Sequence, residues 1–323
     1  MSRILTGVQS TGVPHLGNIL GAIKPAIKMA SDPNNDAFLF IADMHSLTQI
    51  KDGELLRHNT YSTAAAWLAC GLDPNNTTFY RQSDVPETAE LTWYLSCYFP
   101  FQRLTLAHSF KDKADSLKDV NAGLFNYPML MAADILLYDA EYVPVGKDQL
   151  QHLEITRDVA SRFNHLMGET FVMPEARTNE NTMLISGTDG QKMSKSKNNF
   201  IDIFMPEKQL KKALNKDIVT DDTPLEDPKD PEGASVYQLY KLVASEEQVN
   251  QMAEKLKAGG YGWGHCKLDL LNALLTTFKE EREKFDHYMN NKQELDEILA
   301  AGAEKARKVA REVIVRVRAK VGY

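Results

Sequence analysis

Short apolar runs alternate with helix-like periods through the first half of the chain. The runs with strand character cover residues 4–8, 37–42 and 78–82. The segments in which apolar positions recur at helical spacing cover residues 17–29, 54–70 and 88–99. Short strands separated by helices are typical of a parallel sheet that is covered on both faces. This half of the chain therefore predicts an α/β domain with a doubly wound parallel sheet, in which ligands bind at the carboxyl ends of the strands.

The second half begins with a very apolar segment at 122–138, a short strand over 142–145 and a helix over 148–164. A stretch at 219–233 holds six acidic residues and three prolines, which indicates an exposed loop. After it the pattern is purely helical, over residues 236–258, 267–289 and 291–320. We therefore expect an α/β domain over 1–200 and an all-helical C-terminal domain over 201–323, of which one helix can pack back on the first domain.

Composition narrows the class of protein. With 43% hydrophobic and 25% charged residues among 323, the chain has an ordinary globular composition. The longest uncharged apolar runs are too short to span a bilayer, and the N-terminus has no basic segment followed by an apolar stretch. The three cysteines show neither a metal-ligand spacing nor a disulfide framework. We expect a cytoplasmic protein with no membrane association and no zinc or iron–sulfur site.

The net charge of −7 argues against binding of nucleic acid through bulk electrostatics, but it leaves room for a local basic surface. Residues 305–320 carry seven basic side chains and one acidic side chain in a helix-like segment. Such a segment is either a solvated helix face or a surface that contacts phosphates.

A glycine-containing turn follows the first predicted strand. It includes Gly12 and leads into His15-Leu16-Gly17-Asn18 at the start of the first helical segment. Backbone N–H groups at a helix start attract phosphate, and His15 and Asn18 add side-chain donors. Gly17 leaves room for a flat ring against the backbone. Many such turns have no ligand, so this motif is weak evidence on its own.

A second polar motif, Lys192-Met193-Ser194-Lys195-Ser196, lies far along the chain. Two lysines with interleaved hydroxyls can neutralise and bind a triphosphate. Met193 interrupts the polar run, as an anchor to the core does. The two motifs together predict an enzyme that splits ATP into an AMP ester and pyrophosphate.

Asp134 is a third candidate, because it lies within an otherwise apolar segment. A buried carboxylate costs desolvation free energy unless a donor pairs with it. An indole N–H is a donor only, so it suits this acceptor. A neighbouring backbone group or hydroxyl is the alternative partner.

Together these motifs resemble the class I aminoacyl-tRNA synthetases, and within that class the bacterial tryptophanyl-tRNA synthetases. The resemblance extends over nearly the whole chain, and the further segments that carry it are residues 6–12, 21–22, 41–48, 127–136, 143–149, 260–262 and 302–306. It implies a Rossmann-like catalytic domain with a dimer-interface insertion, an anticodon-binding helical domain and a homodimer. It also implies ATP as a substrate with Mg²⁺, and L-tryptophan and tRNA(Trp) as partners.

The resemblance further implies roles for individual residues. Those expected in catalysis are His15, Asn18, Lys192, Lys195 and Lys111. Those expected to bind ATP are Gln9, Ser10, Thr11, Gly17, Asn18, Gly146, Lys147, Asp148, Met183, Lys192, Met193, Ser194, Lys195 and Ser196. Those expected around tryptophan are Asp134, Met131, Tyr127, Leu5, His45 and Gln149.

Four positions depart from the family pattern. Asn18 stands where most class I enzymes have a second histidine, and Ser10-Thr11 replaces a more usual Pro-Ser. Lys147 stands where an acidic residue is common, which reverses a charge beside the expected ATP site.

The reaction that the resemblance implies is attack of the tryptophan carboxylate on ATP, followed by transfer of tryptophan to tRNA. Three alternatives stay open. The first is a tyrosyl-tRNA synthetase, the second a small-molecule nucleotidyltransferase, and the third a non-catalytic synthetase paralogue that binds RNA. The amino acid that drives pyrophosphate exchange separates the first alternative from a tryptophanyl enzyme. The segment 127–136 argues against the second, and absence of adenylate formation would support the third.

Overall fold

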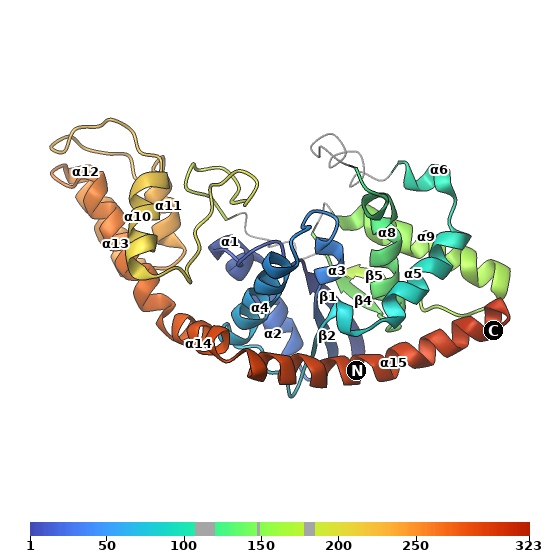
Figure 1. The fold of residues 1–323 in the computed structure, drawn as a ribbon. Coiled ribbons are helices and arrows are strands. Elements are labelled where there is room, and N and C mark those ends of the chain that lie inside the picture. The colour runs from blue at the N-terminus through green and yellow to red at the C-terminus, as the bar shows by residue number, and fades with distance from the viewer. Residues whose placement is uncertain (107–119, 147–148, 178–184) are drawn as a thin grey trace.

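The computed structural model describes residues 1–106, 120–146, 149–177 and 185–323, which contain a five-stranded parallel sheet (Figure 1). The strands are β1 (Ser2–Val8), β2 (Asn35–Ile41), β3 (Thr78–Arg81), β4 (Tyr142–Pro144) and β5 (Glu175–Arg177). Their order is β3-β2-β1-β4-β5, and every pair is parallel. The chain therefore reverses the direction in which it builds the sheet between β1 and β4, and open α/β sheets bind ligands at such a point.

The sheet separates two hydrophobic cores, because alternate side chains of a strand point to opposite faces. Ala37, Leu39 and Ile41 of β2 belong to one cluster of buried residues, whereas Phe38 and Phe40 belong to the other. Helices α2 and α4 lie on one side of the sheet, and α5, α8 and α9 lie on the other (Figure 1). The prediction of a doubly wound parallel sheet is confirmed.

The α/β part contains a helix at each segment predicted to be helical, together with short helices that were not predicted, and the predicted helix over 17–29 includes a π-helical turn. The helical segments are α1 (Leu16–Asn18), the π-helical turn η1 (Ile19–Ile23), α2 (Lys24–Ala30), α3 (Asp43–Ser46), α4 (Gly53–Ala69), the 3₁₀ turn η2 (Gln82–Asp84), α5 (Glu87–Tyr98), α6 (Phe101–Leu104), α8 (Ala122–Leu136) and α9 (Leu150–Met167). Side-chain caps begin three of them. His15 accepts from the N–H group of Asn18, Asp52 from those of Glu54 and Leu55, and Asn121 from that of Leu124.

The C-terminal part is helical, as expected. Its helices are α10 (Glu207–Asp217), α11 (Ser235–Lys241), α12 (Glu246–Ala258), α13 (Trp263–Thr277), α14 (Lys279–Asn290) and α15 (Lys292–Val321). The single helix predicted over 236–258 is wrong, because Ser245 and Gln248 form a capping box that starts a new helix. The helix predicted over 267–289 is likewise divided at Phe278.

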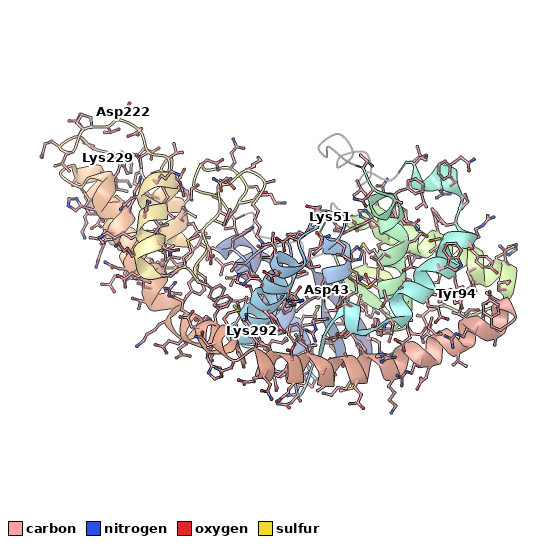
Figure 2. All side chains as sticks on the ribbon, in the orientation of Figure 1. Asp43, Lys51, Tyr94, Asp222, Lys229 and Lys292 are labelled. Carbon is pink, nitrogen blue, oxygen red and sulfur yellow. The ribbon has the colours of Figure 1, made fainter. Side chains whose placement is uncertain are left out.

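An irregular loop joins α10 to α11, as the acidic, proline-containing stretch predicted. Figure 2 labels Asp222 and Lys229 in this loop, at the end of the helical part that lies away from the sheet. The Lys229 ammonium group donates to the carbonyl oxygens of Pro224, Leu225 and Asp227, at 2.7, 3.2 and 3.0 Å. One buried lysine therefore stabilises the loop from inside.

Helix α15 returns from the helical part and runs beside the edge strand β3 (Figure 1). Lys292 and Tyr94 lie close to its opposite ends in Figure 2, and the rings of Tyr94 and Tyr323 are 6.1 Å apart. A helix that covers an edge strand shields the unpaired backbone groups of that strand.

The arginines of α15 form ion pairs within the molecule. Arg307 and Arg311 pair with Glu87, at 3.0 and 3.3 Å. The other two pairs are Arg318 with Glu90 and Arg316 with Asp139, at 2.6 and 2.5 Å. Three carboxylates of the α/β part thus face four arginines of α15, since Arg307 and Arg311 share Glu87, and the Arg311 side chain is 62% exposed. The phosphate-contacting surface over residues 305–320 stays a prediction. In the part of the chain that the structure describes, no helix has the length and apolar character needed to cross a bilayer.

Candidate active site

A cavity of about 290 Å³ lies at the carboxyl ends of β1 and β4, where the sheet changes its building direction. All six side chains predicted to surround tryptophan line it, namely Leu5, His45, Tyr127, Met131, Asp134 and Gln149. Gln9 and Gly146 of the predicted ATP set line it as well. The structure thus brings together residues from β1, α3, α8 and the loop after β4.

Asp134 on α8 is only 3% exposed. Its Oδ2 atom pairs with Nε2 of His45 at 2.8 Å, and its Oδ1 atom accepts from Nε2 of Gln82 at 2.7 Å. Burial raises the pKa of Asp134, while the hydrogen bond and charge of His45 and the bond from Gln82 oppose that rise. The carboxylate is therefore held at the cavity wall by two side chains, and not by the backbone group or hydroxyl that the sequence left open.

Gln82 did not figure among the predicted site residues. It lies at the end of the third predicted strand and is 1% exposed. A buried glutamine at the carboxyl end of a parallel strand was the available signal, because such side chains meet at the ligand-binding edge of the sheet.

Aromatic packing links the cavity to the end of β1. The ring centroids of His45 and Tyr127 are 4.4 Å apart. The Tyr127 hydroxyl accepts a hydrogen bond from Nε2 of Gln9 at 2.7 Å. Gln9 directly follows β1, so this contact connects the cavity with the turn that contains the first polar motif.

That turn forms a reciprocal cap at the start of α1. Nδ1 of His15 accepts from the backbone N–H of Asn18 at 3.2 Å, and Oδ1 of Asn18 accepts from the backbone N–H of His15 at 3.1 Å. The N–H of Gly17 donates to Sδ of Met193 at 3.2 Å. The two polar motifs, which are far apart in the sequence, therefore meet in the structure.

Electrostatics also couples the motifs. The Lys195 side chain lies against the backbone of Gly12. Burial lowers the pKa of His15 to about 4, and the charge of Lys195 adds to this effect. Burial likewise lowers the pKa of Lys195 to about 8, with the charge of Asp202 acting in the opposite direction. A bound anion between the two groups would favour the protonated form of both.

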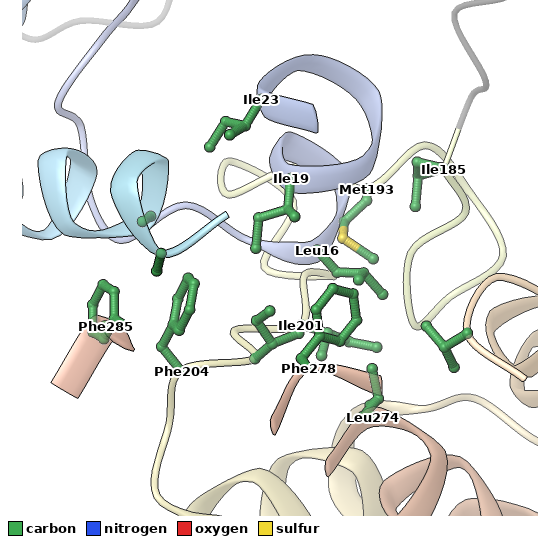
Figure 3. Packing of buried hydrophobic residues seen from close by; sticks show 14 of the residues in the cluster. Leu16, Ile19, Ile23, Ile185, Met193, Ile201, Phe204, Leu274, Phe278 and Phe285 are labelled. Atoms are coloured by element: carbon green, nitrogen blue, oxygen red, sulfur yellow. The ribbon is translucent and has the colours of Figure 1, made fainter. Parts of the chain in front are cut away.

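Met193 anchors the second motif, as its position in the polar run predicts. It is 5% exposed and belongs to the same core as Leu16, Ile19 and Ile201 (Figure 3). The two lysines of the motif differ in exposure: Lys192 is exposed and Lys195 is half-buried.

Asn199 is a second residue that the sequence reasoning missed. It is 3% exposed, and its amide donates to Oδ1 of Asp189 at 2.7 Å and to the carbonyl oxygen of Lys192 at 3.1 Å. Its Oδ1 atom accepts from the N–H of Ser194 at 2.7 Å. Asn199 therefore holds the loop of the second motif from beneath. Its place three residues after that motif was the only signal in the sequence.

The remaining predicted residues are placed as follows. Ser10 is fully buried and its hydroxyl lies 3.2 Å from those of Ser46 and Thr60, so it faces the interior. The hydroxyls of Ser194 and Ser196 are 2.8 Å apart, and Thr11 is partly buried. Lys111, Lys147, Asp148 and Met183 lie outside the described residues. Within those residues, no group of three or more His, Cys, Asp or Glu side chains is placed to hold a metal ion.

Comparison with known proteins decides the family. The family model described as tRNA synthetases class I (W and Y) matches residues 1–279. A tryptophan–tRNA ligase of Campylobacter jejuni is 47% identical over 320 residues, which are 99% of each chain. The chain belongs to the tryptophan–tRNA ligase family. A ligase of the same name from Fusobacterium nucleatum is 45% identical over 323 residues, which cover 100% of this chain and 98% of the relative.

Solved structures of the family agree with this assignment. A tryptophanyl-tRNA synthetase from Campylobacter jejuni complexed with ADP and tryptophan has a TM-score of 0.95 and 46% identity, and the match covers 99% of this chain and 100% of that one. The enzyme from Mycoplasma pneumoniae has a TM-score of 0.79 and 27% identity, with 100% and 98% covered. The sequence motifs predicted a tryptophanyl-tRNA synthetase, and this prediction is confirmed. The prediction that the protein is an enzyme of the aminoacyl-tRNA synthetase class is confirmed with it.

Proposed function

We propose that this chain activates L-tryptophan with ATP and then transfers it to tRNA(Trp). The observation that carries the proposal is the cavity at the carboxyl ends of β1 and β4, which has the Asp134 carboxylate in an otherwise largely apolar wall. The size and polarity of this cavity suit one aromatic amino acid. A synthetase structure that contains ADP and tryptophan supports the same ligands for this chain.

In the first step, a carboxylate oxygen of tryptophan attacks the α-phosphorus of ATP. The bond from that phosphorus to the bridging oxygen of the β-phosphate breaks, and pyrophosphate leaves with the electron pair. We assign stabilisation of the developing charge to His15, Asn18, Lys192 and Lys195, which present donors and positive charge from two loops that meet. Lys111 is proposed as a further cation for pyrophosphate.

Further residues are proposed for the nucleotide itself. Gly17 and the turn at Gly146 would lie against its flat base and ribose, and Ser194 and Ser196 would donate to phosphate oxygens. The same proposal extends to the other predicted ATP residues, which are Gln9, Ser10, Thr11, Lys147, Asp148, Met183 and Met193. For Ser10 the contact is limited to its backbone, because its hydroxyl faces the interior.

Magnesium enters this proposal with the nucleotide. The second motif presents lysines and hydroxyls, which fit phosphate oxygens, and the described residues contain no group of three or more His, Cys, Asp or Glu side chains placed to hold a metal ion. We therefore expect Mg²⁺ to be held by the triphosphate, and we assign no protein ligand to it.

In the second step, a ribose hydroxyl of the terminal adenosine of tRNA attacks the carbonyl carbon of the adenylate, and AMP leaves. We propose that the helical part over 201–323 binds the anticodon, while residues 1–200 carry out both chemical steps. We assign the tRNA contacts to this helical part, including the basic helix α15, where three carboxylates face four arginines and the Arg311 side chain is 62% exposed.

We also propose a homodimer. The α/β part exposes large apolar side chains on neighbouring elements, with Trp93 of α5 67% exposed and Phe101 of α6 64% exposed. Exposed apolar side chains of this kind are typical of protein interfaces. Sedimentation equilibrium tests this, and Phe101→Asp should shift the protein toward the monomer. A cytoplasmic location is proposed from the function and is testable by cell fractionation.

The decisive test is ATP–pyrophosphate exchange with each of the standard amino acids. Tryptophan alone should drive exchange. Exchange driven by tyrosine would indicate a tyrosyl-tRNA synthetase. No exchange with any amino acid would support a non-catalytic RNA-binding protein.

A further inference from the structure

The side-chain amide of Gln82 joins three segments beneath the cavity. Its Nε2 atom donates to Oδ1 of Asp134 at 2.7 Å. Its Oε1 atom accepts from the backbone N–H groups of Met44 and His45, at 3.1 and 3.4 Å. Gln82 follows β3, Met44 and His45 belong to α3, and Asp134 belongs to α8. A single amide therefore ties the start of α3 to the carboxylate on α8.

His45 completes this arrangement from the other side of the carboxylate. Its Nε2 atom lies 2.8 Å from Oδ2 of Asp134. When Asp134 is ionised, its carboxylate only accepts hydrogen bonds, and the tautomer of His45 with a proton on Nε2 donates to it. Each oxygen of Asp134 thus receives one hydrogen bond from the protein and keeps a second acceptor direction. Asp134 and His45 both line the cavity, whereas Gln82 is 1% exposed and lies behind them.

Two roles can be separated for these bonds. Burial at 3% exposure disfavours the charged form of Asp134, and the two donors offset that cost. The bonds also fix the direction of the carboxylate, because rotation about the Cβ–Cγ bond of Asp134 would break both of them. Recognition of a single N–H group requires an ionised carboxylate that is held in one direction.

We propose that Gln82 is a positioning residue for amino-acid specificity, which holds the Asp134 carboxylate so that it accepts the indole N–H of tryptophan. This inference rests on the proposed function and extends it to a side chain that does not line the cavity. Gln82 acts through Asp134, and His45 supplies the matching contact on the second oxygen.

Gln82→Met tests the proposal, because methionine keeps the length of the side chain and removes the amide. The substrates are tryptophan and 3-benzothienylalanine, in which sulfur replaces the indole N–H. The expected result is a loss in kcat/KM for tryptophan of about 10- to 100-fold, mostly through KM, with little change for the analogue. A merely structural role would lower kcat/KM for both substrates by the same factor, and that result would overturn the proposal. Unchanged kinetics for both substrates would overturn it as well.

A double-mutant cycle with Asp134→Asn checks that Gln82 acts through the carboxylate. In the Asp134→Asn background, Gln82→Met should leave the ratio of the two substrates unchanged. A further fall in that ratio would contradict the proposal. Gln49→Met is the matched control, since Gln49 is exposed, and it should leave both substrates unaffected.

Thermal unfolding followed by circular dichroism shows whether each variant folds. If Gln82→Met does not fold, Gln82→Asn carries the test, because the shorter side chain withdraws the amide donor from Asp134 and should lower the same ratio. An unchanged ratio overturns the proposal. If the parent chain itself shows no tryptophan-dependent exchange, the proposed function fails together with the inference. An active parent with unaltered variants overturns the inference alone.

Discussion

Nζ of Lys195 lies 3.1 Å from the position that a Cβ atom on Gly12 would occupy. Gly12 belongs to the turn after β1, and Lys195 belongs to the loop that follows the α/β strands in the sequence. The contact places a cation directly against the backbone at the carboxyl end of β1. Any negatively charged ligand held by the first turn will therefore also face the second loop, so the two loops form one site in this conformation.

Gly12→Ala should reduce tryptophan-dependent pyrophosphate exchange. Gly12 has a φ of +144°, which side chains rarely adopt, and the added methyl group would also press on Lys195. Because charge stabilisation depends on placement of the cation, we expect kcat to fall roughly 10- to 100-fold. Gly53→Ala is the control, since a Cβ atom there meets no atom within 4 Å, and it should retain full activity. Equal activity of the two variants would refute the argument.

The buried imidazole of His15 should make the fold less stable in mild acid. Burial, and then the charge of Lys195, lowers its pKa from 6.5 to about 4. Between these pH values the unfolded chain binds a proton that the folded chain does not, so the free energy of unfolding contributed by this group falls as the pH decreases from 6.5 toward 4. Protonation of Nδ1 would also remove the acceptor for the Asn18 N–H.

Urea unfolding at pH 7 and pH 5 measures this effect. The parent should lose more stability over that interval than His15→Gln, which has no group that titrates there. A parent and variant with the same dependence on pH would show that the folded state accommodates the imidazolium ion.

The order of the first four strands and of the helices between them was predictable, because buried parallel strands are continuous apolar runs and the helices have a different period. The run at 37–42, for example, became β2 (Asn35–Ile41). Strand β5 was missed, since its three residues are exposed and not an apolar run. The division between α11 and α12 was missed because the helical period continues across it. The capping residues Ser245 and Gln248 carried the information, since their spacing is that of a capping box.

The cavity residues were predictable only through the resemblance to a family. Leu5 and Met131 are apolar residues in apolar elements, and nothing in their spacing separates a cavity wall from a core. Gln82 and Asn199 were missed for another reason. Each acts by hydrogen bonds whose partners are set by tertiary structure, such as Asp134 for Gln82, and such partners cannot be read from one sequence.

Asn199→Ala should weaken the loop that carries Lys192 and Lys195. It removes the donors to Asp189 and to the carbonyl of Lys192, and it leaves the N–H of Ser194 without its acceptor. We expect a rise in KM for ATP and a fall in kcat of about tenfold or more, since the lysines lose their fixed positions.

Lys197→Ala is the control within the same loop. Lys197 is exposed and donates to Oε1 of Gln191, so its removal should change neither constant more than twofold. Equal kinetics for both variants would assign Asn199 no part in the site.

Gly302→Ala tests how α15 is held on the sheet. A Cβ atom on Gly302 would lie 1.7 Å from the carbonyl oxygen of Phe79 in β3, so the helix and the edge strand must separate to admit it. The strain should lower the free energy of unfolding by about 1–3 kcal/mol, although alanine is the better helix former. Gly264→Ala in α13 is the matched control, because a Cβ atom there would meet no atom within 4 Å. This variant should stabilise the protein by up to about 1 kcal/mol. Urea unfolding measures both variants. If Gly302→Ala lowers the free energy of unfolding and Gly264→Ala raises it, close contact with β3, and not helix propensity, determines the residue at 302. A stabilising Gly302→Ala would show that α15 is free to move off the strand.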